Sequence, residues 1–291
     1  MSITSSIAFR SFSGFRRVKK NLDLLVHHRT LHPVGTQIHQ VNGLKLALDF
    51  QAPNHRQIYE QSSFESELTE VIKRMMQPQD VFVDIGANFG WHSLNALSNY
   101  PMVQVHAFEP SKRMFELLKR SLDVNGYRNR CSCERVALSD RCGTSKLKTF
   151  SDLDPMHASL YALADWEFQE EDVDLETLDS RAESFSSPVN VIKCDVEGGE
   201  RDVLLGSVRL MRGEFGPPPV WFLEANYESS GMAGFFPSDL IDISAQYAPY
   251  EPFCIRDGQV KPLRSRTSLR HGDNFILAIR DLHSDRLRKV E

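Results

Sequence analysis

The sequence predicts an α/β protein built on an open, doubly wound, mostly parallel sheet with helices on both faces. Beyond Pro78, short apolar runs are separated by helical stretches, which is the pattern of successive βαβ units. The first of these runs ends in an acid and turns through glycines into a helix. At 291 residues, with 41% hydrophobic and 25% charged residues, the chain fits one large globular domain with an N-terminal extension.

Short apolar runs give the predicted strands in order. We expect buried strands at 81–85, 103–108, 189–194, 220–225, 253–256 and 274–280. Residues 131–138 and 145–150 are expected to pair with each other and to turn at Gly143. The long irregular stretch at 151–167 is predicted to be a loop of the kind that forms lids or binding segments.

Helical patterns fill the intervals between these strands. We expect helices at 91–99, from about 111 to 125, from about 199 to 211, and at 238–246. The second of them carries apolar residues on one face, among them Met114, Leu118 and Leu122. Asn125 and Gly126, which tolerate left-handed backbone, are expected to end it.

Residues 1–45 are expected to form a basic, partly disordered extension, followed by the α/β domain at 46–291. The extension is rich in Ser, Arg and Lys and has no acid before Asp23. Apolar residues recur in it at near-helical spacing, at Phe12, Phe15, Val18, Leu22 and Leu25. We favour an unspecialised extension; a basic amphipathic helix that contacts a membrane surface or directs organelle import is the alternative.

Composition argues against several classes of protein. A net charge of -5 gives no bulk attraction to nucleic acid, so we predict no nucleic-acid partner. No stretch approaches the roughly 20 apolar residues that a membrane helix needs. The five cysteines form an odd set without the paired spacing of a zinc site, which favours a soluble protein of the reducing cytoplasm.

The strongest signal for a ligand is the segment Asp84-Ile-Gly-Ala-Asn-Phe-Gly90, which follows directly on the first apolar run. Glycine has no β-carbon, so Gly86 and Gly90 let a nucleoside-type ligand approach the backbone closely. The next strand ends in Glu109, about 20 residues beyond the turn, where a carboxylate accepts hydrogen bonds from both hydroxyls of a ribose. The sequence therefore predicts an adenosyl-binding site.

The details of the turn separate two adenosyl cofactors. Enzymes that bind NAD favour glycines spaced as G-x-G-x-x-G, whose second glycine admits a pyrophosphate. Here three residues separate Gly86 from Gly90, so that spacing is absent. Asp84 also puts a negative charge where a pyrophosphate would be repelled and a cationic, amino-acid-bearing ligand tolerated. These features favour S-adenosyl-L-methionine over NAD.

Six separated motifs occur in order along the chain: Phe64-Glu65, Asp84-Ile-Gly-Ala-Asn-Phe-Gly90, Phe108-Glu-Pro110, Val136-Ala-Leu-Ser-Asp140, Thr177-Leu-Asp179 and Ile192-Lys-Cys-Asp-Val-Glu-Gly198. Together they resemble the FkbM family of methyltransferases, from about Glu65 to Ile279. The resemblance implies a seven-stranded, Rossmann-like methyltransferase sheet whose last strand is antiparallel. It also implies an O-methyltransferase that acts on sugars, glycolipids or polyketide-like natural products. Departures are small: Cys194 replaces a usually aliphatic residue, and Gly199 a frequent alanine.

These patterns assign residues to the cofactor and to catalysis. The predicted cofactor-binding residues are Glu65, Asp84, Gly86, Asn88, Gly90, Glu109, Pro110 and Leu138. We expect Glu65 at the cofactor's amino group and Leu138 at its adenine, with a solvated helix face and the core as their alternative positions.

Methyl transfer to an alcohol also requires a general base, because the hydroxyl must lose its proton. Asp195 and Glu197 are the predicted catalytic pair, since they follow a buried strand at the edge where such sheets bind ligands. An extended chain there would turn both carboxylates to one face. A cap on the following helix is the alternative role for one of them.

The predicted reaction partner is a small-molecule or glycan acceptor. An NAD-dependent oxidoreductase and a non-catalytic adenosyl-binding protein remain alternatives, because open α/β sheets support many functions. We predict no metal site, since the two acids have no evident third ligand. His157, in the irregular stretch, is interpreted as a bystander, and His92 as cover for the cofactor pocket.

Overall fold

The computed structural model describes residues 35–150, 158–161 and 168–290. The apolar pattern between residues 12 and 25 and the side chain of His157 lie outside these ranges. Within the described part of the chain, the helices are all too short or too polar to cross a membrane.

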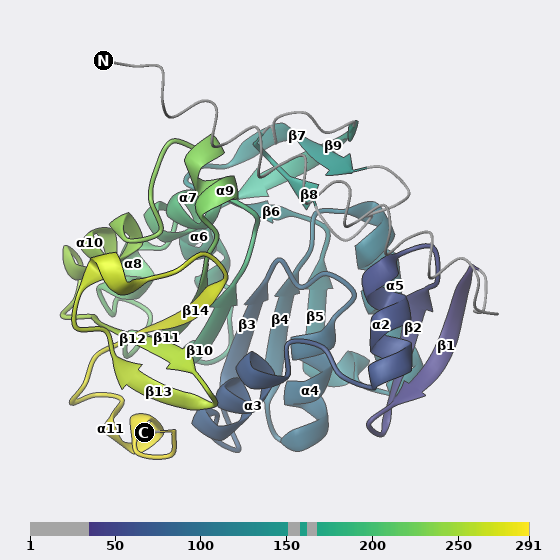
Figure 1. Cartoon of the computed structure of the whole chain (residues 1–291), viewed down its shortest axis with the longest axis horizontal. Helices are drawn as coiled ribbons and strands as arrows, with labels where there is room; N and C mark the ends of the chain where they lie inside the picture. Colours follow the sequence, from purple (N-terminus) through teal and green to yellow (C-terminus); the bar gives the residue numbers. More distant parts are fainter. Residues whose placement is uncertain (1–34, 151–157, 162–167, 291) are drawn as a thin grey trace.

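A central sheet carries the fold, and its strands run in the order β13-β12-β14-β11-β10-β3-β4-β5 (Figure 1). The parallel strands are β5 (Cys131–Glu134), β4 (Gln104–Phe108), β3 (Val81–Ile85), β10 (Val191–Cys194) and β11 (Val220–Ala225). The last strand in the chain, β14 (Asp273–Ala278), lies antiparallel between β11 and β12 (Glu251–Arg256), and β13 (Gln259–Pro262) forms the edge. The predicted open, mostly parallel sheet is confirmed, and β13 makes it eight-stranded where seven strands were expected.

Two apolar cores cover the two faces of this sheet. Successive residues of a strand point to opposite faces, so Phe82 and Phe222 belong to one core, and Val83 and Leu223 to the other. The first face is covered by α2 (Pro53–Gln61), α3 (Ser66–Met75), α4 (Trp91–Asn99), α5 (Lys112–Asn125) and α11 (Ser284–Leu287). The second is covered by α6 (Leu178–Ala182), α7 (Glu200–Leu205), α8 (Val208–Met211) and α10 (Asp239–Ala245).

A hairpin of β1 (Thr36–Val41) and β2 (Leu44–Asp49) begins the described chain. It packs against α5, where the Ser121 hydroxyl accepts the backbone N–H of Ala47 at 2.9 Å. The predicted boundary between residues 45 and 46 falls inside β2, and the division into an extension and a domain stays a prediction.

A second, smaller sheet lies at the carboxyl ends of β3, β4 and β5 (Figure 1). Its strands are β6 (Ala137–Leu138), β9 (Phe168–Glu176), β7 (Gly143–Phe150) and β8 (Ala158–Ser159), in that order. The expected pairing of 131–138 with 145–150 is therefore wrong: β5 pairs with β4 in the central sheet, and β7 pairs with β9. β9 was not recognised in the sequence because it is rich in acids. Its buried residues are Val173 and Leu175, which give too short an apolar pattern to stand out.

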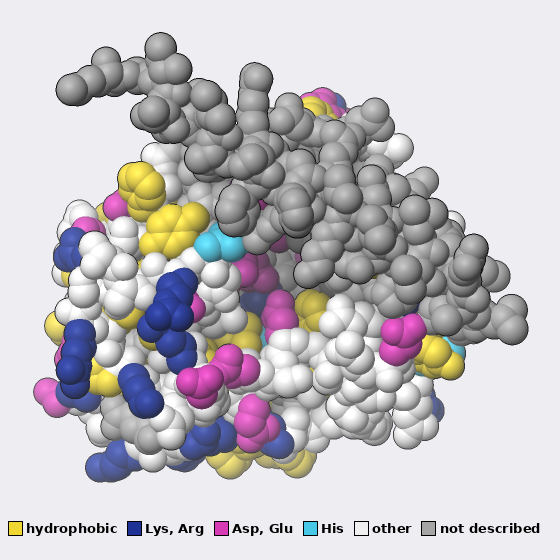
Figure 2. All heavy atoms as spheres, viewed as in Figure 1, with side chains coloured by type: hydrophobic (Ala, Val, Ile, Leu, Met, Phe, Trp, Pro, Cys, Tyr) yellow, Lys and Arg dark blue, Asp and Glu magenta, His cyan; other side chains and the backbone are white. Residues whose placement is uncertain are grey.

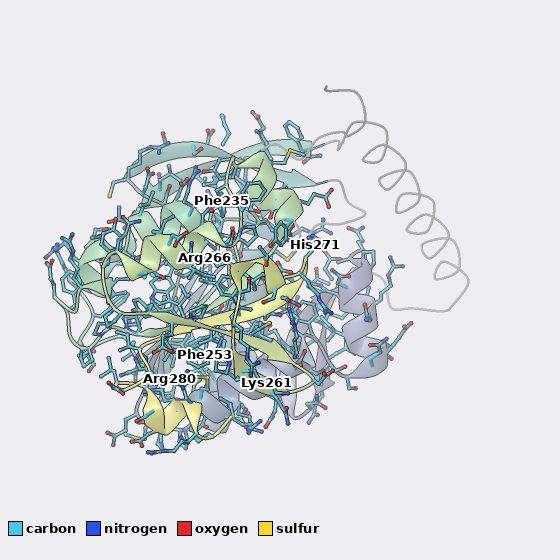
Figure 3. All side chains as sticks on the ribbon, turned by 60° about the vertical axis from the view of Figure 1, so that its left-hand side comes forward. Phe235, Phe253, Lys261, Arg266, His271 and Arg280 are labelled. Carbon is cyan, nitrogen blue, oxygen red and sulfur yellow. The ribbon has the colours of Figure 1, made fainter. Side chains whose placement is uncertain are left out.

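The single helix expected at 199–211 is also wrong, because α7 and α8 divide that stretch at Gly206. A β-carbon on Gly206 would lie 2.0 Å from the backbone oxygen of Ser139, so the chain packs too closely there for a larger residue. Beyond β11, the short helix α9 (Tyr227–Met232) leads toward α10. Figure 3 shows Phe253 of β12 beside Arg280, whose guanidinium lies 5.0 Å from the ring centroid and ties the end of the β14 segment to β12.

Candidate functional site

A cavity of about 860 Å³, its open mouth included, lies at the carboxyl ends of β3, β4 and β10. Figure 2 shows acidic side chains gathered near the middle of this face of the molecule. Asp84 and Gly90 are not part of the lining, and their predicted contact with a cofactor stays a prediction. The structure brings the other predicted residues together in the lining: Glu65, Gly86, Asn88, Glu109, Pro110, Leu138, Asp195 and Glu197.

Glu109 is a buried carboxylate at the end of β4. Its Oε2 accepts the backbone N–H of Asn88 at 2.7 Å, and its Oε1 accepts that of Ser111 at 2.8 Å. Burial raises the pKa of Glu109 to about 7, although both hydrogen bonds act in the opposite direction. Asn88 adopts a left-handed backbone with a φ of 53°, which aims its N–H at the carboxylate.

The turn after β3 is fixed by its neighbours on both sides. The N–H groups of Gly86 and Ala87 both donate to the carbonyl of Phe108 at 3.0 Å. A β-carbon on Gly86 would meet the backbone of Asp195, which no rotamer change can relieve. Gly90 has a φ of 93° and packs against α5 behind the cavity. These glycines therefore bring β3, β10 and α5 close together. Their role in the approach of a ligand stays a prediction.

Asp84 is fully buried and serves the helix that follows it. Its Oδ2 accepts hydrogen bonds from the N–H and the hydroxyl of Ser93, at 3.0 and 2.6 Å, which holds the first turn of α4. Its Oδ1 lies 3.9 Å from the ammonium of Lys193. This lysine offsets the negative charge on which the sequence argument against a pyrophosphate relied.

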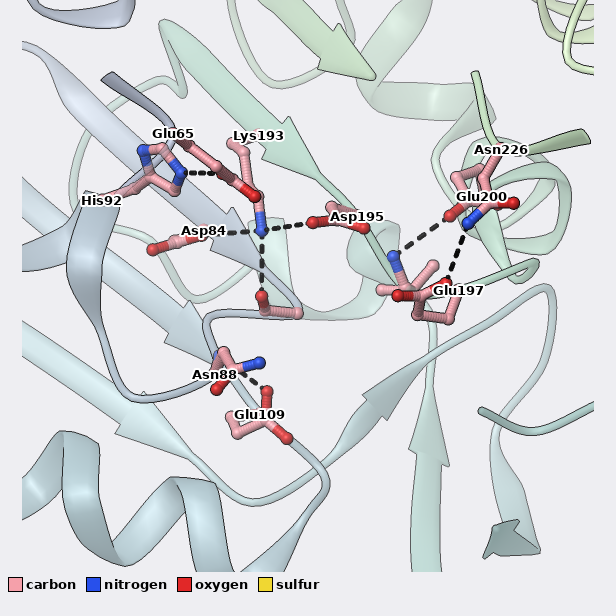
Figure 4. A network of polar contacts seen from close by, with 12 residues as sticks. Glu65, Asp84, Asn88, His92, Glu109, Lys193, Asp195, Glu197, Glu200 and Asn226 are labelled. Carbon is pink, nitrogen blue, oxygen red and sulfur yellow. Dashed lines mark hydrogen bonds and ion pairs between the residues drawn. The ribbon is translucent and has the colours of Figure 1, made fainter. Parts of the chain in front are cut away.

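Lys193 is a buried cation of the lining that sequence reasoning did not single out. Its Nζ donates to the carbonyl of Gly86 at 2.9 Å and lies 3.4 Å from the carboxylate of Asp195 (Figure 4). The available signal was a lysine inside the buried run from Val189 to Cys194, where a charge requires a buried partner.

Asp195 and Glu197 reach the cavity through a turn and not through an extended chain. The strand β10 ends at Cys194, and Glu197 has a left-handed φ of 52°. Buried Glu200 accepts the N–H groups of Val196 and Gly198 at 3.1 Å, and so shapes the turn (Figure 4). Glu200 is the first residue of α7, whose N-cap residue Gly199 makes no side-chain cap hydrogen bond.

Two further polar residues come from the end of β11 and were also missed. Asn226 donates through its Nδ2 to Oε2 of Glu197 at 3.1 Å. Burial, with repulsion from Asp195 and Glu197, raises the pKa of Glu224 to about 9. The stretch from Val220 to Asn226 offered a signal in the sequence, because an apolar strand there ends in an acid and an amide.

Glu65 contacts a histidine at another part of the lining. Its Oε2 lies 2.8 Å from Nε2 of His92, which is itself buried. Burial alone would raise the pKa of Glu65, but the hydrogen bond and charge of His92 outweigh burial and lower it. Glu65 thus enters the cavity as a carboxylate, held from the first turn of α4.

The small sheet closes the cavity with apolar side chains. Leu147, Ala158 and Leu160 line it from β7 and from the β8 segment. The hydroxyl of Ser159 donates to the backbone carbonyl of Glu197 at 2.7 Å, which joins the two sheets at the site. Among the described residues, His, Cys, Asp and Glu side chains form no group of three that could hold a metal ion.

Comparison with known proteins identifies a related domain. The methyltransferase FkbM domain matches residues 84–228 of the chain. Methyltransferase sdnD of Sordaria araneosa is 28% identical over 153 residues, which cover 43% of this chain and 59% of that protein. The 31-O-demethyl-FK506 methyltransferase FkbM of Streptomyces tacrolimicus is 30% identical over 161 residues, which cover 45% of this chain and 60% of that protein. The matches thus span about 60% of the length of these relatives.

Among solved structures, a TehB-like SAM-dependent methyltransferase from Corynebacterium glutamicum has a TM-score of 0.45 at 9% identity, over 77% of this chain and 94% of that one. The FkbM match at 84–228 includes the turn after β3, Glu109 and the loop after β10, which together form most of the polar lining. The chain therefore belongs to the FkbM family of methyltransferases, the family that its motifs resemble.

Proposed function

We propose that the chain is an S-adenosylmethionine-dependent O-methyltransferase that methylates a hydroxyl group of a sugar, glycolipid or polyketide-like molecule. One observation carries this proposal: Glu109, Asp195 and Glu197 line the same cavity. The first suits the ribose of a cofactor, and the other two suit the proton of a reacting hydroxyl. The relative named 31-O-demethyl-FK506 methyltransferase supports an oxygen acceptor.

The residues of the lining fit S-adenosylmethionine. Each oxygen of Glu109 accepts one backbone N–H and keeps a second lone pair for a ribose hydroxyl. Pro110 and Leu138 offer apolar surface to the adenine, and Glu65 offers a carboxylate to the amino group. The acidic lining suits a sulfonium and disfavours the pyrophosphate of NAD.

The chain's own residues then align the acceptor and remove its proton. Bound S-adenosylmethionine supplies a methyl group that the sulfonium makes electrophilic. The lining would position the acceptor oxygen for attack on that methyl group, and Asp195 or Glu197 would accept the hydroxyl proton. As the oxygen–carbon bond forms, the carbon–sulfur bond breaks. The products are a methyl ether, S-adenosylhomocysteine and a protonated carboxyl group.

Calorimetry tests the cofactor directly. We expect S-adenosylhomocysteine to bind to the purified chain and NADH to give no heat of binding at the same concentration. Tight binding of NADH alone would favour the oxidoreductase alternative. Binding of S-adenosylhomocysteine without transfer to any acceptor would favour a non-catalytic adenosyl-binding protein.

A screen with S-adenosylmethionine labelled in its methyl group tests the acceptor. Hydroxylated sugars, glycolipids and polyketides are incubated with the chain, and labelled products are identified by mass spectrometry. We expect label on an oxygen, and transfer to nitrogen or carbon acceptors only would contradict the proposed class.

We also propose a small-molecule or glycan acceptor and the cytoplasm as the compartment. The five cysteines, all within the described residues, are free thiols, in keeping with a reducing environment. The net charge of -5 gives no attraction to nucleic acid. Fractionation of the source cells with an antibody against the chain measures the compartment, and recovery with membranes would favour a role for the basic N-terminal segment.

A further inference from the structure

Lys193 is a charged residue of the cavity to which the proposed function gives no role. It belongs to β10 and is 4% exposed. Its ammonium lies between three oxygens: the carbonyl of Gly86 at 2.9 Å, Oδ2 of Asp195 at 3.4 Å and Oδ1 of Asp84 at 3.9 Å (Figure 4).

These contacts join two parts of the cavity. Gly86 belongs to the turn after β3, beside the residues proposed to bind the cofactor. Asp195 belongs to the loop after β10, which carries the proposed base. Because β3 and β10 are neighbours, with Lys193 in register with Asp84, the ammonium sits at the junction of the turn and the loop. The Lys193 side chain therefore fixes the distance between the turn after β3 and the loop after β10.

The charge of Lys193 separates its role from that of a base. Burial lowers the pKa of Lys193, but attraction from Asp195, Asp84 and Glu65 outweighs burial and raises it above the ordinary value. The side chain stays an ammonium at neutral pH, so it cannot take a proton from the acceptor. What it supplies is a set of N–H donors at a fixed place.

We propose that Lys193 is a positioning residue for methyl transfer, which holds the Asp195 carboxylate against the Gly86 turn. An ion pair at Oδ2 restricts the rotation of the Asp195 side chain, and thereby the direction from which a proton can be taken. A displacement of about 1 Å in such a group costs about 100-fold in rate. This inference rests on the function proposed above.

Three variants separate positioning from simple charge balance. Lys193→Met removes the ammonium and keeps an unbranched side chain, but it leaves Asp84 buried without its cation, so Tm should fall by about 10 °C. Asp84→Asn with Lys193→Met removes both charges and should recover most of that loss. Lys119→Met, which removes a half-buried lysine paired with Glu116, controls for loss of a lysine.

The double variant gives the decisive measurement, because it removes the Lys193 and Asp84 charges together and leaves neither buried without its partner. We expect its Kd for S-adenosylhomocysteine to stay within about tenfold of the wild-type value. With the acceptor found in the screen, we expect kcat to fall about 100-fold and KM to change little. A crystal structure of its complex with S-adenosylhomocysteine should show the Asp195 carboxylate turned from the Gly86 turn or in several rotamers.

Recovery of kcat together with Tm in the double variant would overturn the proposal, because Lys193 would then serve only to neutralise Asp84. An unchanged single rotamer of Asp195 in the crystal would overturn it as well, and that measurement needs no acceptor. Failure of the wild-type chain to bind S-adenosylhomocysteine would count against the proposed function. Crystals of the ligand-free variants would still decide whether Lys193 positions Asp195.

Discussion

A β-carbon on Gly86 would lie 1.9 Å from the backbone oxygen of Asp195, so the turn after β3 and the loop after β10 touch through their backbones. No side-chain rotation relieves a contact with backbone. Any larger residue at position 86 must push the turn and the loop apart. The turn and the loop are two parts of the cavity lining, so the lining would be displaced as well.

Gly86→Ala is therefore expected to lower stability and cofactor affinity together. The backbone has a φ of 69° at this position, so strain adds to the clash and the cost should reach at least about 2 kcal/mol. Gly258→Ala is a matched control, because its φ is 70° and no atom lies within 4 Å of the added carbon. Thermal unfolding and calorimetry measure both effects, and equal Tm values for the two variants would contradict the packing argument.

Glu109→Ala is expected to weaken the binding of S-adenosylhomocysteine by about 30-fold or more. Two charge-assisted hydrogen bonds to a ribose account for roughly 2 to 4 kcal/mol. Calorimetric titration measures the change, and Glu116→Ala, on the exposed face of α5, controls for loss of a carboxylate. Unchanged affinity in Glu109→Ala would remove this residue from the binding site.

Affinity for S-adenosylhomocysteine should depend on pH through the same carboxyl group. The pKa of Glu109 is raised to about 7 in the ligand-free chain, and the ionised form is the better acceptor for two hydroxyl donors. Binding should therefore weaken as the pH falls below 7, approaching tenfold per pH unit, and level off above it. Titrations from pH 5.5 to about 8.5 test this. A flat profile for Glu109→Gln, beside a sloping wild type, is the expected control.

Glu224→Gln should stabilise the ligand-free chain at high pH only. Burial and the nearby carboxylates raise the pKa of Glu224 from 4.5 to about 9. Below pH 4.5 the carboxyl group is neutral in the folded and the unfolded chain, and its contribution to the free energy of unfolding is fully present. As the pH rises toward 9, the unfolded chain releases the proton first, so this contribution is lost. Melting curves should show a higher Tm for Glu224→Gln near pH 8 and equal values near pH 4. The opposite order would contradict the raised pKa.

Asp195→Asn and Glu197→Gln are expected to retain binding of S-adenosylhomocysteine. Each keeps the shape of the side chain and removes its charge, so the variant of the true base should transfer methyl about 100-fold more slowly. Single-turnover assays with labelled methyl groups separate the chemical step from binding. If both variants transfer at the wild-type rate, neither carboxylate is the base, and a variant that loses affinity instead belongs to the cofactor contacts.

The central sheet could be predicted because its strands are continuous apolar runs. The bounds expected for β3, α4 and β11 agree with those observed, since apolar patterning and turns mark both ends. The small sheet could not be predicted in the same way. In β9, exposed acids outnumber the buried Val173 and Leu175, so no alternating apolar pattern stands out.

The position of Glu109 and Asp195 in the cavity lining could be predicted, because each follows the end of a buried strand. Lys193 was missed because it lies inside such a strand, where apolar packing is the ordinary expectation. Glu197 was predicted for the wrong geometric reason, since a left-handed turn held by Glu200 brings it to the cavity. Contacts between distant segments decide both cases, and periodicity in one sequence does not encode them.

The cavity draws its lining from two separate parts of the chain. The central sheet supplies Glu109 and Asp195, whereas β7 and the β8 segment supply Leu147, Ala158 and Leu160. These strands lie between β6 and α6, and the hydroxyl of Ser159 in β8 donates to the carbonyl of Glu197, so the apolar wall is fastened to the loop that carries the carboxylates. An exchange of Leu147, Ala158 or Leu160, designed to change which acceptor the proposed enzyme takes, therefore has to retain Ser159.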